Sequence, residues 1–272
     1  ENIVDGWDDP RMPTISGLRK RGYTPESLKN FALTVGVSKR ENVIDASLLE
    51  FCIRADLNQV APRAMAVMDP IKIKLINYEN EGGEKINFDI NPQQKELGTR
   101  EINFSKELYI ENEDFQENPE DGFFRLSVGE EVRLKNAYII KAVDIVKDEK
   151  GRVTEVLCEY DSKSRSGSNT PESNRKVKGT IHWVSATDSV KAKVNIYDRL
   201  FKVPEPGKEN DLKNEVNQNS LEVKEAFVEP YLAESLEAQQ FQFQRLGYFV
   251  RTDNKKTLEF NKTVGLRDSW KK

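Results

Sequence analysis

The sequence has little of the residues on which most enzyme active sites depend. Its 272 residues include one histidine, two cysteines and three methionines. One histidine, His182, cannot build a metal cluster or a conventional catalytic triad, and two cysteines are too few for a disulfide framework or a zinc site. We therefore interpret His182 as structural, or at most as a surface contact, and Cys52 and Cys158 as small core residues.

Sequence motifs of catalysis are missing as well. There is no Gly-rich phosphate loop, no metal-ligand spacing and no nucleophile elbow. Carboxylate pairs such as Glu130-Glu131 fall on a predicted turn, where acidic neighbours are usually solvated. We predict no catalytic residue and no metal site in this chain.

Long apolar runs and a strong charge imbalance are also lacking. No run approaches the roughly 20 residues that a membrane helix needs, and the first residues, Glu1 to Val4, do not resemble a signal peptide. A net charge of −4 argues against coating nucleic acid through bulk electrostatics. We expect a cytoplasmic monomer with no DNA or membrane partner, and any RNA must be bound by local basic patches.

The start of the chain carries helix signals. Thr24 followed by Pro25 and Glu26 is typical of a helix start, Gly36 is typical of an end, and Asp45 is suited to cap a second helix. This pattern predicts a helical unit too thin to fold alone, which should pack on something larger.

The hydrophobic period then changes to two. Residues 71–75 and 86–90 alternate strictly, and a turn signal between residues 142–146 and 153–160 predicts a hairpin. The polar stretch Lys163 to Lys176 has no large apolar residue and predicts a mobile loop. Many short strands with frequent turns favour barrels or sandwiches, and about 200 residues would make two.

The stretch Phe123 to Val146 combines this alternation with isolated cations. In Val132-Arg133-Leu134-Lys135 a strand would bury the apolar pair and expose the two cations together, while Arg125 would enter on the preceding strand. Such a face is suited to unstacked RNA bases, although any half-buried antiparallel strand exposes cations on its wet side. The apolar residues expected in the core are Leu126, Val128, Val132, Leu134, Tyr138, Ile140 and Val143.

Several stretches together resemble the C-terminal half of glutaminyl-tRNA synthetases, which are class I aminoacyl-tRNA synthetases. They follow the family's order over nearly the whole chain. These stretches are GWDDPRMPTISGLRKRG (6–22), APRAMAVMDP (61–70), VRLKNAY (132–138), VKGTIHWVS (177–185), YDRLFKVPEP (197–206), FQFQRLGYF (241–249) and FNKTVGLRD (260–268).

The resemblance implies a mainly β fold with a small N-terminal α part. Residues 1–60 would form a helical connecting subdomain at the end of the catalytic region, and residues 61–272 would form two antiparallel β-barrels that bind the anticodon. The distal barrel would span roughly residues 95–175, and the flanking segments would build the proximal one. The implied partner is glutamine tRNA. The ATP, magnesium and glutamine sites of the full-length ligase would lie upstream of Glu1, so this chain should hold no cofactor and be inactive alone.

Site residues carry over by matching motif. Arg63 of APRAM, with Gln242 and Arg245 of FQFQR, would contact the middle anticodon base. Arg125 would recognise the third base, and Arg133 with Lys135 would hold the first. The candidate contacts to the tRNA backbone or inner stem are Arg19, Lys20, Arg21 and Lys39. The alternative for the run 19–21 is that it only ends a helix.

Two positions depart from the family pattern. Lys135 replaces an arginine, so a point charge stands where a planar bidentate contact is usual. Phe123 and Phe124 replace polar or basic residues beside Arg125, and packing in the barrel is the favoured interpretation for both.

Three alternatives remain at this point. One is the related glutamyl-tRNA synthetases, and another is a non-enzymatic RNA-binding barrel of the ribosomal-RNA-binding type. The third is a protein-interaction β-domain with no RNA role. Fold alone does not separate them, because one fold can serve many functions.

Overall fold

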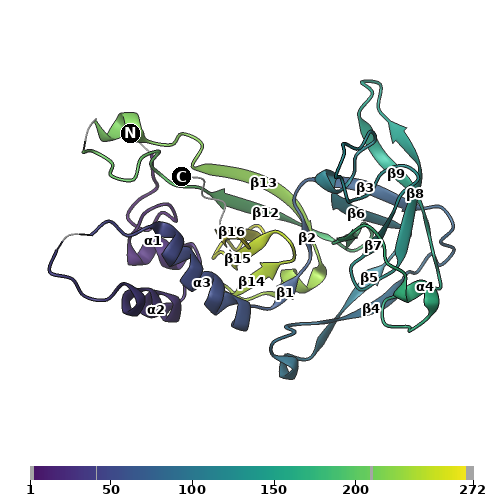
Figure 1. Ribbon diagram of the computed structural model, residues 1–272, viewed down its shortest axis with the longest axis horizontal. Coiled ribbons are helices and arrows are strands. Elements are labelled where there is room, and N and C mark those ends of the chain that lie inside the picture. The colour runs from purple at the N-terminus through teal and green to yellow at the C-terminus, as the bar shows by residue number, and fades with distance from the viewer. Residues whose placement is uncertain (1–2, 41, 209–210, 268–272) are drawn as a thin grey trace.

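The computed structural model describes residues 3–40, 42–208 and 211–267. Helices pack at one end of an elongated molecule, one sheet occupies the middle and a second sheet forms the other end (Figure 1). The fold is mainly β with a small helical part, which confirms the predicted class. Residue Asp268 of the last family-like stretch lies outside the described residues.

The helical part begins where the sequence signals predicted. Its helices are α1 (Ile15–Lys20), α2 (Pro25–Val35) and α3 (Ala46–Val60). The Thr24 hydroxyl accepts from the Ser27 N–H at 3.1 Å, and the Asp45 carboxylate accepts from the Ser47 N–H at 2.8 Å. These caps satisfy N–H groups that have no partner within their helices. Ile53 and Leu57 of α3 are fully buried against the first sheet.

The first sheet joins early and late parts of the chain. The spatial order of its seven strands is β1-β14-β15-β16-β12-β13-β2. The bounds are β1 (Arg63–Ala64), β2 (Ala66–Val67), β12 (Val190–Tyr197), β13 (Leu221–Val228), β14 (Gln240–Phe243), β15 (Gly247–Arg251) and β16 (Glu259–Val264). Its core is rich in aromatic side chains from the last third of the chain.

The second sheet has the order β10-β7-β8-β9-β3-β6-β11, and a two-stranded ribbon, β4-β5, lies beside it. The bounds are β3 (Pro70–Leu75), β4 (Glu84–Asp89), β5 (Thr99–Phe104), β6 (Glu107–Glu111), β7 (Glu131–Leu134), β8 (Ile139–Lys147), β9 (Val153–Tyr160), β10 (Thr180–Ile181) and β11 (Val184–Ser185). The predicted hairpin is β8-β9. Short helices are η1 (Lys95–Leu97), η2 (Asn112–Asp114), α4 (Pro171–Asn174), η3 (Leu212–Glu215) and η4 (Pro230–Glu234).

An aromatic stack and a buried ion pair are among the contacts that the first sheet makes with its neighbours. Tyr109 of β6 in the second sheet stacks on Phe227 of β13 with ring centroids 4.3 Å apart. Arg100 of β5 in the ribbon forms a buried ion pair with Glu229, which follows β13. Because the Arg100–Glu229 pair is shielded from water, we expect it to help hold the ribbon against the first sheet.

Three sequence-based expectations were wrong in detail. Arg125 lies in a loop before β7 rather than on a strand, since only its neighbour Leu126 makes an isolated bridge, to Phe115. Val128 is exposed rather than in the core, because it sits at the turn that precedes β7. The polar stretch 163–176 contains α4 and buries Ser164, so it is folded onto the sheet rather than loose.

The expectations for strand 132–135 and for the two cysteines were confirmed. Val132 and Leu134 are fully buried while Arg133 and Lys135 are partly exposed, as the period of two predicted. Cys52 and Cys158 are buried free thiols. Among the helices of the described residues, none has both the length and the apolar character needed to cross a membrane.

Candidate nucleic-acid interface

Arg63 lies where the helical part meets the first sheet. Strands β1 and β14 pair in parallel, and this register sets Arg63 beside Gln242. The Arg63 Nη2 donates to the backbone oxygen of Asn58 at 3.1 Å and to its Oδ1 at 3.0 Å. The buried Nη1 of Arg63 has no hydrogen-bond partner among the described residues, so this guanidinium retains a donor for a further acceptor.

Gln242 is oriented by two residues that the sequence analysis did not identify. Its Nε2 donates to the Tyr248 hydroxyl at 3.0 Å, and that hydroxyl lies 3.4 Å from Asn58 Oδ1. Asn58 therefore contacts both Arg63 and Tyr248. Neither partner stands out in the sequence, because Asn58 is one polar residue of a helix and Tyr248 one aromatic residue of a strand.

Lys135 approaches the same region from the second sheet. Burial, followed by the positive charges of Arg63 and Arg245, lowers the pKa of its ammonium. The described residues provide it with no carboxylate partner. Three cations from two sheets thus converge, and only Arg245 among them is neutralised by a close carboxylate. The free energy of this arrangement would fall if an anionic or hydrogen-bond-accepting ligand bound there.

Arg245 is held by a buried carboxylate of the second sheet. Its Nη1 lies 2.5 Å from Asp114 Oδ2 and its Nη2 lies 2.7 Å from Asp114 Oδ1, a bidentate pair. The Asp114 carboxylate is fully buried. The Arg245 backbone has a φ of 68°, in the left-handed region that non-glycine residues rarely adopt. The tight turn between β14 and β15 therefore directs this side chain from the first sheet toward Asp114, at the junction between the two sheets.

Arg125 binds the same carboxylate. Its Nη1 lies 3.2 Å from Asp114 Oδ1 and 3.1 Å from both the backbone oxygen and Oε1 of Glu113. The side chain remains 37% exposed, so it can meet a ligand without leaving its loop. The structure thus brings Arg125 and Arg245 to one point.

His182 lies on the far side of Arg245. Its Nδ1 is 3.1 Å from Arg245 Nη1, and its Nε2 is 3.5 Å from Glu111 Oε1. Glu111 also accepts the backbone N–H groups of Met68 and Asp69 at 2.8 and 2.9 Å. Because His182 is buried, the structural interpretation is confirmed over the surface contact.

Arg133 is bound within the chain. Its Nη1 donates to the Ser164 oxygen at 3.0 Å, and its Nη2 donates to the Ser173 oxygen at 2.7 Å. Both acceptors belong to the stretch 163–176, which explains why that stretch is ordered. Arg133 and Lys135 leave the same strand face but meet different surroundings, since Lys135 lies near Arg63 and Arg245.

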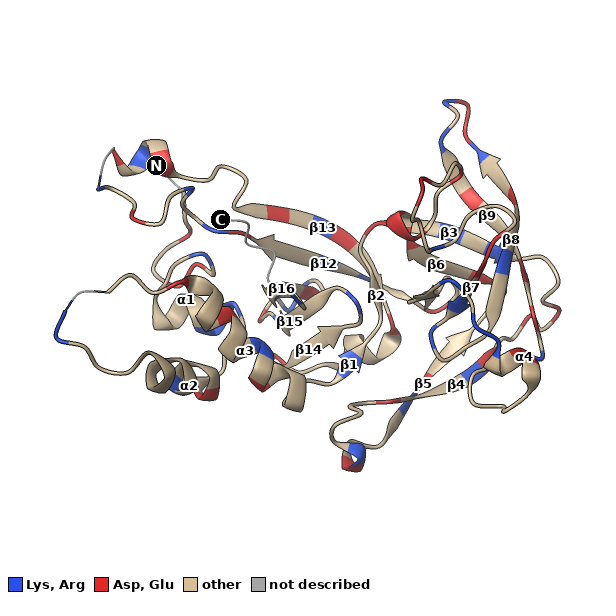
Figure 2. Cartoon of the chain, viewed as in Figure 1, with Lys and Arg blue, Asp and Glu red and all other residues tan. Residues whose placement is uncertain are grey.

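The basic run divides in a similar way. Arg19 is exposed at the end of α1, and Lys20 pairs with Asp8 at 2.5 Å. Arg21 is turned inward and donates to the backbone oxygens of Tyr197 and Thr263. Lys39 is exposed in the connection between α2 and α3. Figure 2 shows cations and acids distributed over both sheets rather than one uniformly basic face.

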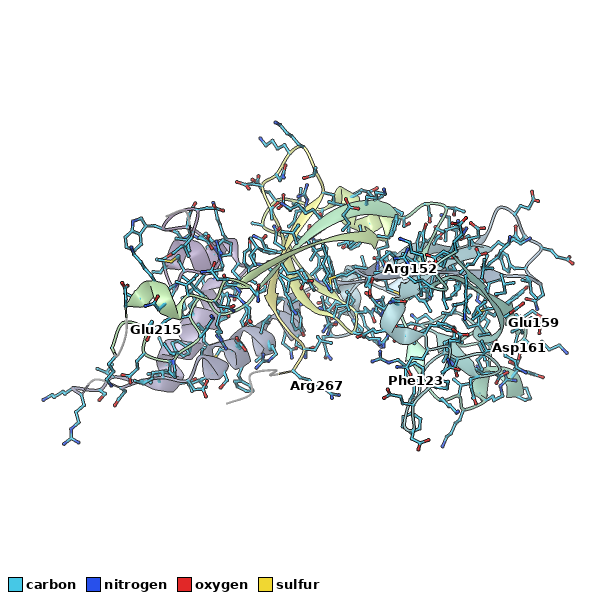
Figure 3. The ribbon with its side chains drawn as sticks, turned by 90° about the horizontal axis from the view of Figure 1, so that it is seen from above. Phe123, Arg152, Glu159, Asp161, Glu215 and Arg267 are labelled. Atoms are coloured by element: carbon cyan, nitrogen blue, oxygen red, sulfur yellow. The ribbon has the colours of Figure 1, made fainter. Side chains whose placement is uncertain are left out.

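The aromatic pair beside Arg125 also divides. Phe124 is 64% exposed, whereas Phe123 is partly buried. Figure 3 labels Phe123 in the part of the molecule that the second sheet forms. Gly179 packs against the Phe124 backbone oxygen, where a Cβ would come within 2.5 Å. The loop that carries Arg125 is thereby fixed against the segment before β10, and Phe124 is available for stacking on an unpaired base.

Chemically, the junction offers guanidinium, ammonium and amide donors at an aromatic-bearing surface. Such groups recognise the edges and faces of unstacked bases. The described residues contain no cluster of three or more side chains able to ligate a metal ion.

Family models match most of the chain. Residues 61–161 and 180–252 each match an anti-codon binding domain of tRNA synthetases class I (E and Q). Residues 1–59 match the catalytic domain of the same group. The two anti-codon binding matches include the six predicted base-binding residues, which are Arg63, Arg125, Arg133, Lys135, Gln242 and Arg245.

Individual relatives agree with these matches. The chain is 50% identical to a glutamine–tRNA ligase of Aliivibrio fischeri, over 99% of this chain and 49% of that protein. It is 49% identical to a glutamine–tRNA ligase of Vibrio vulnificus, over 100% of this chain and 49% of that protein. It is 48% identical to a glutamine–tRNA ligase of Escherichia coli O157:H7, over 99% of this chain and 49% of that protein. The chain therefore spans about half the length of the curated relatives it matches.

Proposed function

We propose, from the premise that this chain belongs to the class I tRNA synthetases of the E and Q group, that it binds tRNA through the anticodon. Its relatives are named glutamine–tRNA ligases, so we infer that the partner is glutamine tRNA. The alternatives of a ribosomal-RNA-binding barrel and a glutamyl enzyme are not favoured by those relatives.

The observation that carries this proposal is the convergence of Arg63, Lys135 and Arg245 from two sheets. Burial, and then the positive charges of Arg63 and Arg245, lower the pKa of Lys135, and the described residues leave Lys135 without a counter-charge. A splayed base with its phosphate would supply acceptors and negative charge at that point. The local cluster also explains how a chain with net charge −4 could bind RNA.

We assign the individual contacts as follows. Arg63, Gln242 and Arg245 bind the middle anticodon base, with Asn58 and Tyr248 orienting the first two. Arg125 binds the third base, where a guanidinium facing guanine contributes about 1–3 kcal/mol of discrimination. Lys135 holds the first base.

Arg133 has a less direct role in this assignment than Lys135. Its guanidinium is already bound to backbone oxygens of residues 164 and 173. We propose that Arg133 supports recognition of the first base chiefly by holding the folded stretch 163–176 in place. Among the backbone candidates, the exposed Arg19 and Lys39 are better placed than Arg21, and Lys20 is paired with Asp8.

We further propose that the longer protein is a glutamine–tRNA ligase that uses ATP with magnesium. The catalytic chemistry would belong to its other half, since only residues 1–59 match the catalytic-domain family. Residues 1–60 would connect that half to the anticodon-binding region, with the second sheet as the distal barrel and the first as the proximal barrel. The protein would act in the cytoplasm as a monomer.

A test uses RNA stem-loops that contain only the anticodon arm. This chain should bind the glutamine anticodon arm more tightly than a glutamate anticodon arm of equal length. Equal affinity for both arms would contradict the assignment to glutamine tRNA. No binding to either arm, even at low salt where phosphate contacts are strongest, would contradict RNA binding itself.

A further inference from the structure

We infer that Asp114 couples recognition of the third anticodon base to recognition of the middle base. The inference rests on the proposed function and adds to it a positioning residue that touches no base. Asp114 is the last residue of η2, in the second sheet's part of the chain. It holds one guanidinium from each of the two candidate base-binding sets.

The geometry makes one oxygen common to both arginines. Asp114 Oδ1 lies 2.7 Å from Arg245 Nη2 and 3.2 Å from Arg125 Nη1. The second oxygen, Oδ2, lies 2.5 Å from Arg245 Nη1. Because the carboxylate is fully buried, water does not compete for it. Movement of either guanidinium must therefore change the hydrogen bonding of the other.

The carboxylate also allows two positive charges to lie close together. Without it, Arg125 and Arg245 would face one another in a partly desolvated junction and repel. A base that draws Arg125 toward solvent frees Oδ1 for Arg245, which strengthens the bidentate pair and fixes Arg245 for the middle base. Without the correct third base, Arg125 stays on Oδ1 and Arg245 is held less firmly for the middle base.

The other side of Arg245 is fixed by protein contacts. His182 lies 3.1 Å from Arg245 Nη1, and Glu111 behind it accepts two backbone N–H groups. Arg245 Nη1 is therefore held by both His182 and Asp114. Since only the Asp114 side also contacts Arg125, the change in Arg125 is transmitted through Asp114.

A matched control lies elsewhere between the same two sheets. Glu229 forms a buried ion pair with Arg100, and this pair also joins the first sheet to the β4-β5 ribbon beside the second. Within the part of the chain that the structure describes, neither Arg125 nor Arg245 contacts that pair. Glu229→Gln thus removes a buried charge across the junction without altering the shared carboxylate.

The experiment is a double-substitution cycle in the RNA. Anticodon arms with the glutamine sequence, a changed middle base, a changed third base and both changes are titrated against this chain. The same four titrations are made with Asp114→Asn and with Glu229→Gln, and folding of each variant is checked by circular dichroism. The penalty of a base change is the factor by which it weakens binding. The coupling is the product of the two single-change penalties divided by the penalty of the double change.

We expect a coupling of at least about fivefold in the unmodified chain, at the low end of measured couplings between sites. It should fall to about one in Asp114→Asn and persist in Glu229→Gln, although both variants lose stability. If Asp114→Asn does not fold, His182→Asn replaces it, because freeing Arg245 on its other side should also lower the coupling.

The outcomes separate the inference from the function on which it rests. If the double-change penalty in the unmodified chain equals the product of the two single-change penalties, the coupling is overturned and anticodon recognition still holds. Full coupling in the Asp114 and His182 variants overturns the role of this carboxylate. A chain that ignores both single base changes contradicts the proposed function itself.

Discussion

Arg63 and Gln242 are neighbours across a parallel pair of short strands, although one follows the first helices and the other lies near the end of the chain. Their partners Asn58 and Tyr248 complete a small polar network between α3 and the first sheet. This network makes the proposed middle-base site depend on how the helical part packs against the sheet.

The first prediction concerns Tyr248→Phe. The change removes the hydroxyl that accepts from Gln242 and contacts Asn58, so Gln242 should lose its orientation. We expect discrimination against a changed middle base to fall by about 1 kcal/mol, the scale of one hydrogen bond. Tyr78→Phe is the matched control, because its hydroxyl donates to Phe104 in the other core. An equal effect of the two variants on discrimination would contradict the network.

Arg125→Ala should weaken binding of glutamine tRNA and reduce selectivity at the third base. The expected loss of discrimination is about 1–3 kcal/mol. Titrations with tRNAs of other anticodons should change little. Arg152→Ala is the control, since that arginine is paired with Asp148 on the β8-β9 turn. An equal loss for all tRNAs would mean that Arg125 contacts only the backbone.

Lys135→Arg restores the residue type that the family resemblance implies. Because the surroundings already lower the pKa of Lys135, a guanidinium that stays charged and can bind in two places should preserve or strengthen tRNA binding. The affinity for glutamine tRNA is the measurement. A large loss would contradict the position assigned to the first base.

Arg133→Ala should release the stretch 163–176. Its guanidinium donates to four acceptors in that stretch, the backbone oxygens of Ser164, Ser173 and Arg175 and the Ser166 hydroxyl. We expect faster hydrogen exchange over residues 164–176 and faster proteolysis there, with little change in the β4-β5 ribbon. Lys135→Ala on the same strand is the control and should leave exchange in that stretch unaltered. Unchanged exchange in Arg133→Ala would show that the stretch folds without this anchor.

Glu111 predicts a dependence of stability on pH. Burial raises its pKa, but His182 and the N–H groups of Met68 and Asp69 outweigh burial, and the pKa lies below its ordinary value of 4.5. A lowered carboxyl pKa gives stability that is present above the unfolded pKa and is lost as pH falls through the folded one. Glu111→Gln should therefore be less stable at pH 7 and show a flatter loss of melting temperature below about pH 4.5. An unchanged acid slope would contradict this contribution.

The fold was largely predictable because its signals are local. Helix caps at Thr24 and Asp45, and the alternation at Val132 and Leu134, each act over a few residues. The order of stretch 163–176 was not predictable, because a polar segment gains its structure from the distant Arg133. Val128 was misplaced since its local pattern continues into a turn.

The site was predictable only in part, for the same reason. Family-like motifs identified Arg63, Gln242, Arg125 and Arg245, but not the residues that position them. Asp114 stands in the acidic stretch 111–114, where the sequence gives no sign that it is fully buried between two arginines. Only the three-dimensional structure pairs it with side chains so far apart in the chain.

The central claim is that this chain recognises the glutamine anticodon. The most direct test titrates the chain with glutamine tRNA and with the same tRNA carrying a changed middle base, at two salt concentrations. We predict that the changed base weakens binding at both concentrations, because base contacts add to the salt-sensitive phosphate contacts. Equal affinities that fall together with salt would contradict the claim and leave only backbone binding.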